Sequence, residues 1–467
     1  MDRSVDLAVI GGGPGGYAAA LKAVGLGMSA AVVEKEKLGG VCLNWGCIPT
    51  KSLLYSARLL HEMKTAGLFG ISVENARPVF EGVLRRSRFC ADRLGGGIEF
   101  LMKNKNVAVI YGTGSLTGPQ TVEVRDRDGN VTETISAKHI LIAVGGRPKL
   151  LPGVVPDGRI IWTARHALAP EKQPETLTII GGGAIGAEMA SFYQAMGTQV
   201  TVIEGMNRVL PAEDRDVSEA VRKSFTRRGI EIVTEASVKS VAAEEEHAAV
   251  HFTADGEEQV RISSAVLMAL GVSPNTANLG LEKVGIAVNA AGGIVTDEWG
   301  MTSEPSVFAV GDATVPPFLA HKAVRQGITA VERIAGKKDI RPWASLPMPA
   351  CTFCMPQAAS IGLTEEKARA EFGDIAVGRF PFLGNGKSVV IGETEGFVKT
   401  VINRKDGRIL GVHMVGEGVT ELVGAMSMAM TAGLTWEKAA ETIFPHPTQS
   451  EMLEEALLAA FGEAIHV

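Results

Sequence analysis

The stretch LAVIGGGPGG (7–16) decides the fold of this chain, and LTIIGGGAIG (177–186) repeats its pattern. In both, a short apolar strand runs into G-x-G-x-x-G, and an apolar helical stretch and a second strand follow. The second strand ends in an acid, Glu34 in the first copy and Glu204 in the second, 23 positions after the first glycine in each case. The glycines of the two fingerprints are Gly11, Gly13, Gly16, Gly181, Gly183 and Gly186.

This spacing suits a bound dinucleotide. One glycine permits the tight strand-to-helix turn, one lets a pyrophosphate reach backbone N–H groups at the helix N-terminus, and one lets helix and strand pack closely. The acid then accepts hydrogen bonds from a ribose hydroxyl. A single G-x-G-x-x-G can be an ordinary turn, but two complete units predict two bound dinucleotides. A carboxylate at Glu204 repels a 2′-phosphate, so the second site favours NAD over NADP, although Arg208 is close in sequence.

Composition excludes several classes of protein. The 467 residues carry 46 Lys and Arg against 52 Asp and Glu, a net charge of −6, and no basic stretch, so nucleic acid is not an expected partner. Hydrophobic residues make up 46% of the chain, enough for the cores of several domains. No apolar run reaches the roughly 18 residues of a membrane span, and the N-terminus enters a strand at once, without room for a secretory signal. We expect a cytoplasmic α/β protein with no membrane span.

The rest of the chain divides at changes of composition. Between the fingerprints, TVEVRDRDGNVTETIS (121–136) predicts a hairpin that turns at Asp128-Gly129. A proline-rich connector, RPWASLPMPA (341–350), precedes FVKTVINRKDGRILGVHMVG (397–416), which predicts two strands of alternating polarity and leads into helical stretches. The expected fold is therefore α/β, with two Rossmann-like domains followed by a C-terminal α+β domain.

Two cysteines follow the first fingerprint, in GGVCLNWGCIPTKS (39–52). On an ideal helix Cys42 and Cys47 are about 7.5 Å apart along the axis, whereas a disulfide needs Cα atoms within about 7 Å. A disulfide therefore requires irregular backbone, which Asn44 and Gly46 allow. Cys47 then lies near the positive end of a helix, where a thiolate is stabilised, with Lys51 one turn further on. The alternatives are two buried thiols or a redox disulfide against a flavin, and the position after a dinucleotide fold favours the disulfide.

The string GGVCLNWGCIPTK, together with both fingerprints, resembles the flavoprotein disulfide reductases, and among them the lipoamide dehydrogenases. The resemblance runs from residue 5 to about 460. SVFAVGDAT (306–314) is similar to the second FAD motif of the family, PFLAHKA (317–323) to a stretch that closes over the flavin, and GGAIGAE (182–188) to a motif whose glutamate pairs with the lysine beside the flavin.

The resemblance implies cofactors and site residues. FAD would lie on the first fingerprint with Glu34, and NAD on the second with Glu204 and Gly271. It assigns Asp312 to the ribitol of FAD, and it pairs Glu188 with Lys51. Gly114 and Ala320 complete the FAD contacts. The domains implied are an FAD-binding domain (1–147), an NAD-binding domain (148–272), a central domain that completes the FAD site (273–343) and a dimerisation domain (344–467).

A candidate base lies near the C-terminus, in PHPTQSEMLEEALLAAFG (445–462). Alone, Thr448-x-x-Glu451 predicts a capping box, and a histidine before a cap is unremarkable. In the family that the chain resembles, HPT-x-S-E supplies the base that exchanges protons with a substrate dithiol, here His446, and Glu451 holds that imidazole. There the base reaches the disulfide of the other subunit, so the resemblance implies a homodimer. The two roles of Glu451 are compatible.

The resemblance implies oxidation of dihydrolipoamide, free or on a lipoyl-bearing protein, by NAD. Cys42 would exchange with substrate thiols and Cys47 would face FAD. One alternative is an NAD(P)H-dependent reductase of another small disulfide, and a second is a docking subunit of a lipoyl-protein complex. The chain departs from the family pattern at positions that bear on substrate choice: Trp45, Val272, Phe444 and Pro445.

A second cysteine pair, Cys351 and Cys354, forms C-x-x-C. A structural zinc needs two further ligands, and no Cys or His is near in sequence. We expect buried thiols rather than a second redox pair, and no metal.

Overall fold

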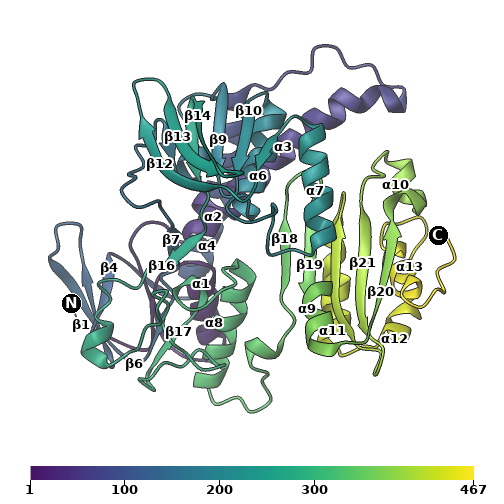
Figure 1. Cartoon of the computed structure of the whole chain (residues 1–467). Coiled ribbons are helices and arrows are strands. Elements are labelled where there is room, and N and C mark those ends of the chain that lie inside the picture. Colours follow the sequence, from purple (N-terminus) through teal and green to yellow (C-terminus); the bar gives the residue numbers. More distant parts are fainter. Residues whose placement is uncertain (1, 467) are drawn as a thin grey trace. The chain divides into compact units, whose positions relative to one another are not determined.

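The computed structural model describes residues 2–466. Contacts divide the chain into two compact units, unit 1 (residues 1–52, 84–149 and 271–346) and unit 2 (residues 53–83, 150–270 and 347–467). Two helices, α3 (Cys47–Thr65) and α4 (Phe80–Asn104), contribute residues to both units (Figure 1). The division into four consecutive domains stays a prediction.

Unit 1 is built on a seven-stranded sheet in the order β3-β2-β1-β6-β5-β4, with β17 also paired to β6. The strands β3, β2, β1, β6 and β17 are parallel, whereas β4, β5 and β6 form an antiparallel meander that includes the predicted hairpin. The strands β7 and β16 form a separate short antiparallel pair in unit 1. The strands are β1 (Asp2–Ile10), β2 (Ala30–Glu34), β3 (Ala108–Tyr111), β4 (Thr113–Gly118), β5 (Thr121–Arg125), β6 (Val131–Ile142), β7 (Gly146–Pro148), β16 (Val272–Pro274) and β17 (Val307–Ala309).

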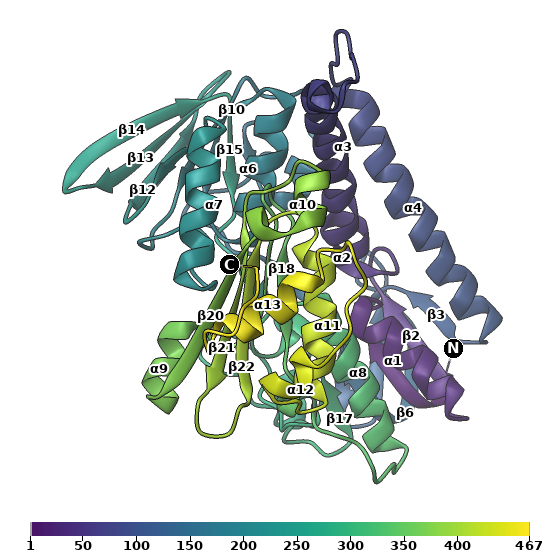
Figure 2. The same ribbon diagram turned by 90° about the vertical axis from the view of Figure 1, so that its right-hand side faces the viewer.

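Helices α1 (Pro14–Gly25) and α8 (Ala320–Ile334) of unit 1 pack against each other with little space between their backbones (Figures 1 and 2). A Cβ atom at Gly327 would lie 2.5 Å from the carbonyl oxygen of Gly15, so this approach requires glycine. The parallel strand β2 reads AAVVE and is buried along its whole length, as expected for a strand covered on both faces. The helical segments of unit 1 are α1 (Pro14–Gly25), α2 (Gly40–Trp45), η2 (Leu281–Val284), η3 (Gly311–Ala313), α8 (Ala320–Ile334) and η4 (Trp343–Ser345), with parts of α3 and α4.

The first half of unit 2 repeats the parallel arrangement on a smaller scale. A five-stranded parallel sheet has the order β11-β10-β9-β15-β8, and an antiparallel sheet β12-β13-β14 follows it in the chain. The elements are β8 (Ile161–Trp162), α5 (Ala164–Ala167), β9 (Thr176–Ile180), α6 (Ala184–Met196), β10 (Gln199–Ile203), α7 (Arg215–Arg227), β11 (Glu231–Val233), β12 (Ser237–Ala243), β13 (Ala248–Ala254), β14 (Glu257–Ser263) and β15 (Ala265–Met268), with η1 (Ala66–Phe69) preceding them.

The second half of unit 2 is an antiparallel sheet in the order β18-β19-β22-β21-β20 with helices against it (Figure 2). The elements are β18 (Pro349–Thr352), β19 (Ala358–Gly362), α9 (Glu365–Phe372), β20 (Ile375–Pro381), η5 (Phe382–Gly384), α10 (Gly386–Val390), β21 (Phe397–Asn403), β22 (Ile409–Val415), α11 (Val419–Thr431), α12 (Trp436–Ala440) and α13 (Glu451–Ala459). These sheets and helices confirm the predicted fold class.

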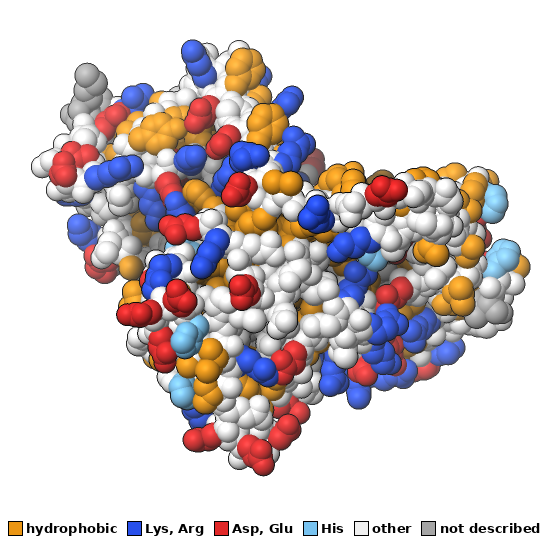
Figure 3. Space-filling model, turned by 90° about the horizontal axis from the view of Figure 1, so that it is seen from above, with side chains coloured by type: hydrophobic (Ala, Val, Ile, Leu, Met, Phe, Trp, Pro, Cys, Tyr) orange, Lys and Arg blue, Asp and Glu red, His pale blue; other side chains and the backbone are white. Residues whose placement is uncertain are grey.

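The two strands of alternating polarity differ from expectation in one respect. Every residue of β21 and β22 is buried, including polar Lys399 and His413. Helices contact both strands, α13 and α9 at β21 and α11 and α7 at β22. On the face seen in Figure 3, acidic and basic side chains are interspersed.

Candidate active site

The first fingerprint has the geometry that the glycines predict. Gly11, after β1, has φ +104°, and a Cβ there would lie 2.4 Å from the carbonyl oxygen of Ala143. A Cβ at Gly16 would lie 1.9 Å from the carbonyl oxygen of Gly11. At Gly13, the N-cap of α1, the nearest atom is 4.0 Å away. The outer glycines therefore serve the turn, and the middle one leaves room for a pyrophosphate at the helix N-terminus.

Glu34, the acid of the first fingerprint, has a structural role that the sequence did not predict. Glu34 is buried at the end of β2; its Oε2 accepts the N–H of Gly12 at 2.8 Å and its Oε1 the N–H of Glu36 at 2.7 Å. The carboxylate thus holds the glycine loop in place. Each oxygen has a second lone pair, so ribose hydroxyls are still able to donate to it.

The second fingerprint repeats this geometry in unit 2. Gly181 has φ +107°, and Cβ atoms at Gly181 and Gly186 would lie 2.4 and 1.9 Å from the carbonyl oxygens of Ala269 and Gly181. No atom lies within 4 Å of a Cβ at Gly183, the N-cap of α6. The residues present therefore fit a second dinucleotide.

Glu204 repeats the role of Glu34. It accepts the N–H groups of Gly182 at 2.5 Å and Met206 at 2.7 Å. Arg208, which opposed a preference for NAD, pairs with Glu366 at 3.2 Å. Its charge is therefore partly neutralised, and the carboxylate at the end of β10 dominates this side of the site.

Cys42 and Cys47 form a disulfide, with Cα atoms 4.7 Å apart. The required irregularity lies at Gly46, where α2 ends and α3 begins with φ −149° and ψ −112°. The buried amide of Asn44 secures the turn by donating to the carbonyl oxygens of Leu38 at 2.9 Å and Gly40 at 3.0 Å. Cys47 is the first residue of α3, so it lies at the positive end of that helix, as predicted.

Arg88 of α4 also contacts the cysteine loop, and sequence reasoning missed it. Its guanidinium donates to the carbonyl oxygen of Asn44 at 2.7 Å and lies 4.6 Å from the ring centroid of Trp45. Nothing in the basic, amphipathic sequence of α4 distinguishes this arginine from its neighbours.

Asp312 lies in η3 and is half-buried in unit 1, beside the buried lysine Lys322. Burial raises the pKa of Asp312, and the ammonium of Lys322 opposes that shift. Burial lowers the pKa of Lys322 to about 8, and Asp312 opposes that change. Gln326 accepts the N–H of Gly311 at 2.8 Å. Lys322 and Gln326 lie on the buried face of α8, which begins at Ala320. The sequence did not predict that Lys322 is buried, because a lysine three positions before an arginine is typical of an exposed helix face.

The predicted base is held by its predicted partner. Nδ1 of His446 lies 2.8 Å from Oε1 of Glu451, and Oε2 accepts the N–H of Thr448 at 2.8 Å. Burial acts to raise the pKa of Glu451, but these two contacts outweigh it and hold that pKa below its usual range. The capping box is only half formed, because α13 begins at Glu451 with Ser450 as N-cap and the hydroxyl of Thr448 bonds the carbonyl oxygen of Pro445 instead.

The remaining predicted residues lie in several parts of the fold. Lys51 is one turn after Cys47 in α3, in unit 1, and Glu188 is buried in α6, in unit 2, where Oε1 accepts the N–H of Phe353 at 2.9 Å. Their pairing stays a prediction. Gly114 is in β4, where a Cβ would press on Ile10 at 3.1 Å. Gly271 has φ +96° directly before β16.

Cys351 and Cys354 are thiols rather than half-cystines in the structure. Cys354 is fully buried and Cys351 is half-buried, which agrees with thiols rather than a disulfide. Within residues 2–466, no three His, Cys, Asp or Glu side chains gather in a way that would hold a metal ion. Over the same residues, no helix combines the length and the apolar character that crossing a membrane demands.

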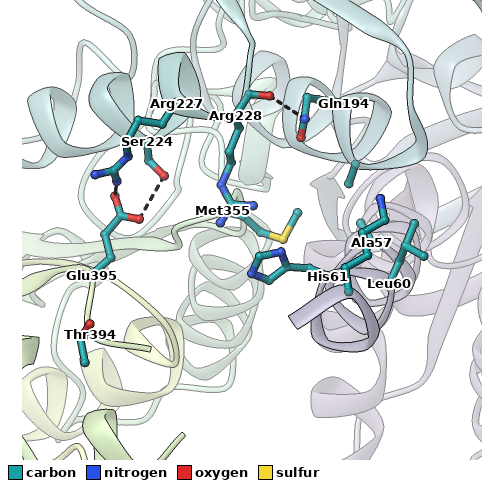
Figure 4. A pocket seen from close by; sticks show the side chains of 12 residues that line it. Ala57, Leu60, His61, Gln194, Ser224, Arg227, Arg228, Met355, Thr394 and Glu395 are labelled. Atoms are coloured by element: carbon teal, nitrogen blue, oxygen red, sulfur yellow. Dashed lines mark hydrogen bonds and ion pairs between the residues drawn. The ribbon is translucent and has the colours of Figure 1, made fainter. Parts of the chain in front are cut away.

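A cavity of about 620 Å³ in unit 2 contains none of the predicted site residues (Figure 4). Arg227 pairs with Glu395, whose other oxygen lies 3.3 Å from the hydroxyl of Ser224. Burial raises the pKa of nearby Glu393, and the charges of Arg58 and Arg228 oppose that shift. Charges of both signs therefore meet in this cavity. Its lining is Ala57, Leu60, His61, Lys64, Gln194, Ala195, Ser224, Arg227, Arg228, Met355, Thr394 and Glu395.

Two dinucleotide folds and a disulfide at a helix N-terminus define a nucleotide-dependent thiol–disulfide redox enzyme. The family model described as Pyridine nucleotide-disulphide oxidoreductase matches residues 5–327, and that of its dimerisation domain matches residues 348–457. The chain therefore belongs to the pyridine nucleotide-disulphide oxidoreductases. The predicted cofactors, FAD and NAD, are those of this family, and the dimerisation domain supports a homodimer.

Similar proteins cover the whole chain. A protein from Zymomonas mobilis named dihydrolipoyl dehydrogenase is 45% identical over 469 residues, and one of the same name from Rhizobium etli is 43% identical over 481 residues, each with 100% of both chains covered. The solved structure of LpdA from Mycobacterium tuberculosis matches with a TM-score of 0.90 at 28% identity, covering 97% of this chain and 99% of that one. The HOCl-induced flavoprotein disulfide reductase RclA from Escherichia coli, as a Cu(II) complex, matches with a TM-score of 0.87 at 27% identity, covering 98% and 99%.

Proposed function

We propose that this chain is a dihydrolipoyl dehydrogenase, which oxidises dihydrolipoamide, free or on a lipoyl-bearing protein, and reduces NAD. The observation that carries the proposal is the Cys42–Cys47 disulfide at the first turn of α3, directly after a dinucleotide fold. The full-length relatives named dihydrolipoyl dehydrogenase support lipoamide as the substrate. A cytoplasmic location, expected from the sequence, is part of the same proposal.

The disulfide accepts two electrons in two exchanges. A substrate thiolate attacks Sγ of Cys42, the Cys42–Cys47 bond breaks, and Cys47 leaves as a thiolate. The second substrate thiolate attacks the substrate sulfur of the mixed disulfide, which releases Cys42 and closes the lipoamide ring. The N-terminus of α3 stabilises the thiolate of Cys47.

His446 takes the proton from the attacking substrate thiol. Its side chain is 79% exposed, and Glu451 orients the ring through Nδ1, which leaves Nε2 for the substrate. An exposed base needs a second surface to complete a site. We therefore place His446 against the disulfide of the partner subunit, and exposed apolar side chains such as Met428 and Ile443 as part of the covered face.

The fingerprints hold the two cofactors. FAD would lie on the first fingerprint with Glu34 and Asp312, and NAD on the second with Glu204. Bound FAD supplies two-electron transfer between the cysteine pair and the nicotinamide. The role of the chain is to position both cofactors.

An anaerobic half-reaction tests the proposal. Dihydrolipoamide is added to the purified holoenzyme, the visible spectrum is recorded, and NAD is added. We expect a long-wavelength absorbance band and then NADH. A band with NADH but not with dihydrolipoamide would mean that the disulfide reacts and the substrate is another disulfide. Loss of activity in the C47S variant would exclude docking as the main function, whereas retained activity would contradict the redox role of the pair.

A further inference from the structure

The loop that carries His446 has few contacts that hold it in place. Residues 441–443 and 445–447 are exposed, and Nδ1 of the His446 ring is held by Glu451. Glu451 in turn depends on the backbone of Thr448, whose N–H donates to Oε2 at 2.8 Å. The position of the base is therefore only as well defined as the position of Thr448.

A buried side chain from a distant segment holds Thr448. Nδ2 of Asn385 donates to the carbonyl oxygen of Thr448 at 2.9 Å, across 63 residues of sequence. Asn385 is only 4% exposed. Its Oδ1 accepts the N–H of Ser388 at 2.9 Å and the hydroxyl of Ser388 at 3.0 Å, so it also caps α10. The amide therefore sits in a fixed orientation, with its oxygen on the helix and its N–H on the loop.

These bonds form one continuous chain to the base. It runs from Nδ2 of Asn385 to the carbonyl of Thr448, from the N–H of the same residue to Glu451, and from Glu451 to Nδ1 of His446. A second contact steadies the next residue, because Nε2 of Gln449 donates to the carbonyl oxygen of Glu417 at 3.0 Å. A buried amide that bonds a loop carbonyl is costly to leave without its partner, so the loop is held in one position.

We infer that Asn385 is a positioning residue for the base His446. The inference rests on the proposed function, because it assigns Asn385 a role only through that base. Loss of the Nδ2–H donor frees Thr448, which loosens Glu451 and lets the imidazole rotate away from the position in which it takes a thiol proton. Since a displacement of the base costs catalysis and not cofactor binding, the effect is confined to the reaction with the dithiol.

The test variant is N385S in the holoenzyme. Serine keeps an oxygen that caps α10 but is too short to reach Thr448. The matched control is S388A, which removes the hydroxyl bond to Oδ1 and leaves the Nδ2 bond intact. We expect N385S to lower kcat/KM for dihydrolipoamide about tenfold, the value of one hydrogen bond, and S388A to lower it less than about twofold. NADH oxidation by ferricyanide, which needs no proton from a dithiol, is unchanged in both.

A mutant cycle with H446Q separates this inference from the proposed function. If Asn385 acts through His446, N385S has no further effect in the H446Q background. Wild-type activity in H446Q alone overturns the role of the base and the inference with it. A large loss in H446Q together with wild-type activity in N385S, or with an equal loss in both backgrounds, overturns the inference alone. If N385S does not retain FAD, N385D, which keeps the size and the cap and replaces the donor by an acceptor, takes its place in the same cycle.

Discussion

Oε1 of Glu451 lies 2.8 Å from Nδ1 of His446, so a carboxylate holds one nitrogen of the imidazole and leaves the other, Nε2, to meet a substrate. A glutamine at this position would donate its amide N–H to Nδ1 and force the ring proton onto Nε2, where a base must accept. We expect E451Q to lower kcat/KM for dihydrolipoamide about 100-fold while NADH oxidation by ferricyanide is retained. The control is E454Q, in the same turn of α13. Equal rates for E451Q and E454Q would contradict the orienting role.

The glycines of the second fingerprint provide a matched pair of alanine variants. At Gly186 a Cβ would overlap the carbonyl oxygen of Gly181, whereas at Gly183 it would meet open space. We expect G186A to lower the midpoint of thermal unfolding by several degrees. G183A keeps the wild-type midpoint but weakens NAD binding about tenfold or more, because the methyl group fills the space of the pyrophosphate. Titration with NAD and thermal unfolding measure the two effects, and a stable G183A with normal NAD affinity would refute the placement of NAD.

Glu204 offers a test of cofactor choice that spares the loop. In E204Q the amide oxygen is still able to accept the N–H of Gly182, so the glycine loop keeps that bond, while the N–H of Met206 after the strand loses its acceptor. The negative charge that repels a 2′-phosphate is gone. We expect the ratio of kcat/KM for NAD over NADP to fall about tenfold, while FAD content stays at the wild-type level because Glu34 serves the other fingerprint. An unchanged ratio would mean that another group sets the preference.

The features that could be predicted from the sequence depend on residues that lie close together in one continuous segment. The turn at Gly11, the break at Gly46 and the disulfide it allows depend on neighbours in the chain. Glycine and cysteine also carry their physical role in the residue type, because few other residues adopt that backbone or form that bond.

The features that were missed join residues far apart in sequence. Asn385 meets Thr448 across 63 positions, and Arg88 meets Asn44 across 44 positions. An isolated asparagine or lysine has no pattern that reports burial. The alternation in β21 predicted polar residues facing solvent, but Lys399 is buried because carboxylates from α7 and α9 neutralise it.

The cluster around Lys399 leads to a prediction for stability. Its ammonium lies 2.8 Å from Oδ1 of Asp214, 2.9 Å from Oδ2 of Asp216 and 2.7 Å from Oε2 of Glu365, with buried His413 close by. Burial acts to lower the pKa of Lys399 and to raise that of Asp214, but the ion pair outweighs burial, so the pKa of Lys399 is raised and that of Asp214 is lowered. The ion pair therefore contributes fully to the free energy of unfolding above the unfolded-state pKa of aspartate, about 4, and below that of lysine, about 10.

Replacing Lys399 by methionine leaves Asp214 buried without its cation. We expect K399M to lower the free energy of unfolding by about 3 kcal/mol between roughly pH 5 and 9. Because the depressed pKa of Asp214 makes its contribution fade as the pH falls below about 4, the difference from wild type shrinks there. Urea unfolding between pH 3 and 8 measures this, with the exposed Lys367 of α9 as the control in K367M, where the change is within about 0.5 kcal/mol. A difference that stays constant down to pH 3 would show that lost packing of the lysine chain, rather than its charge, accounts for the destabilisation.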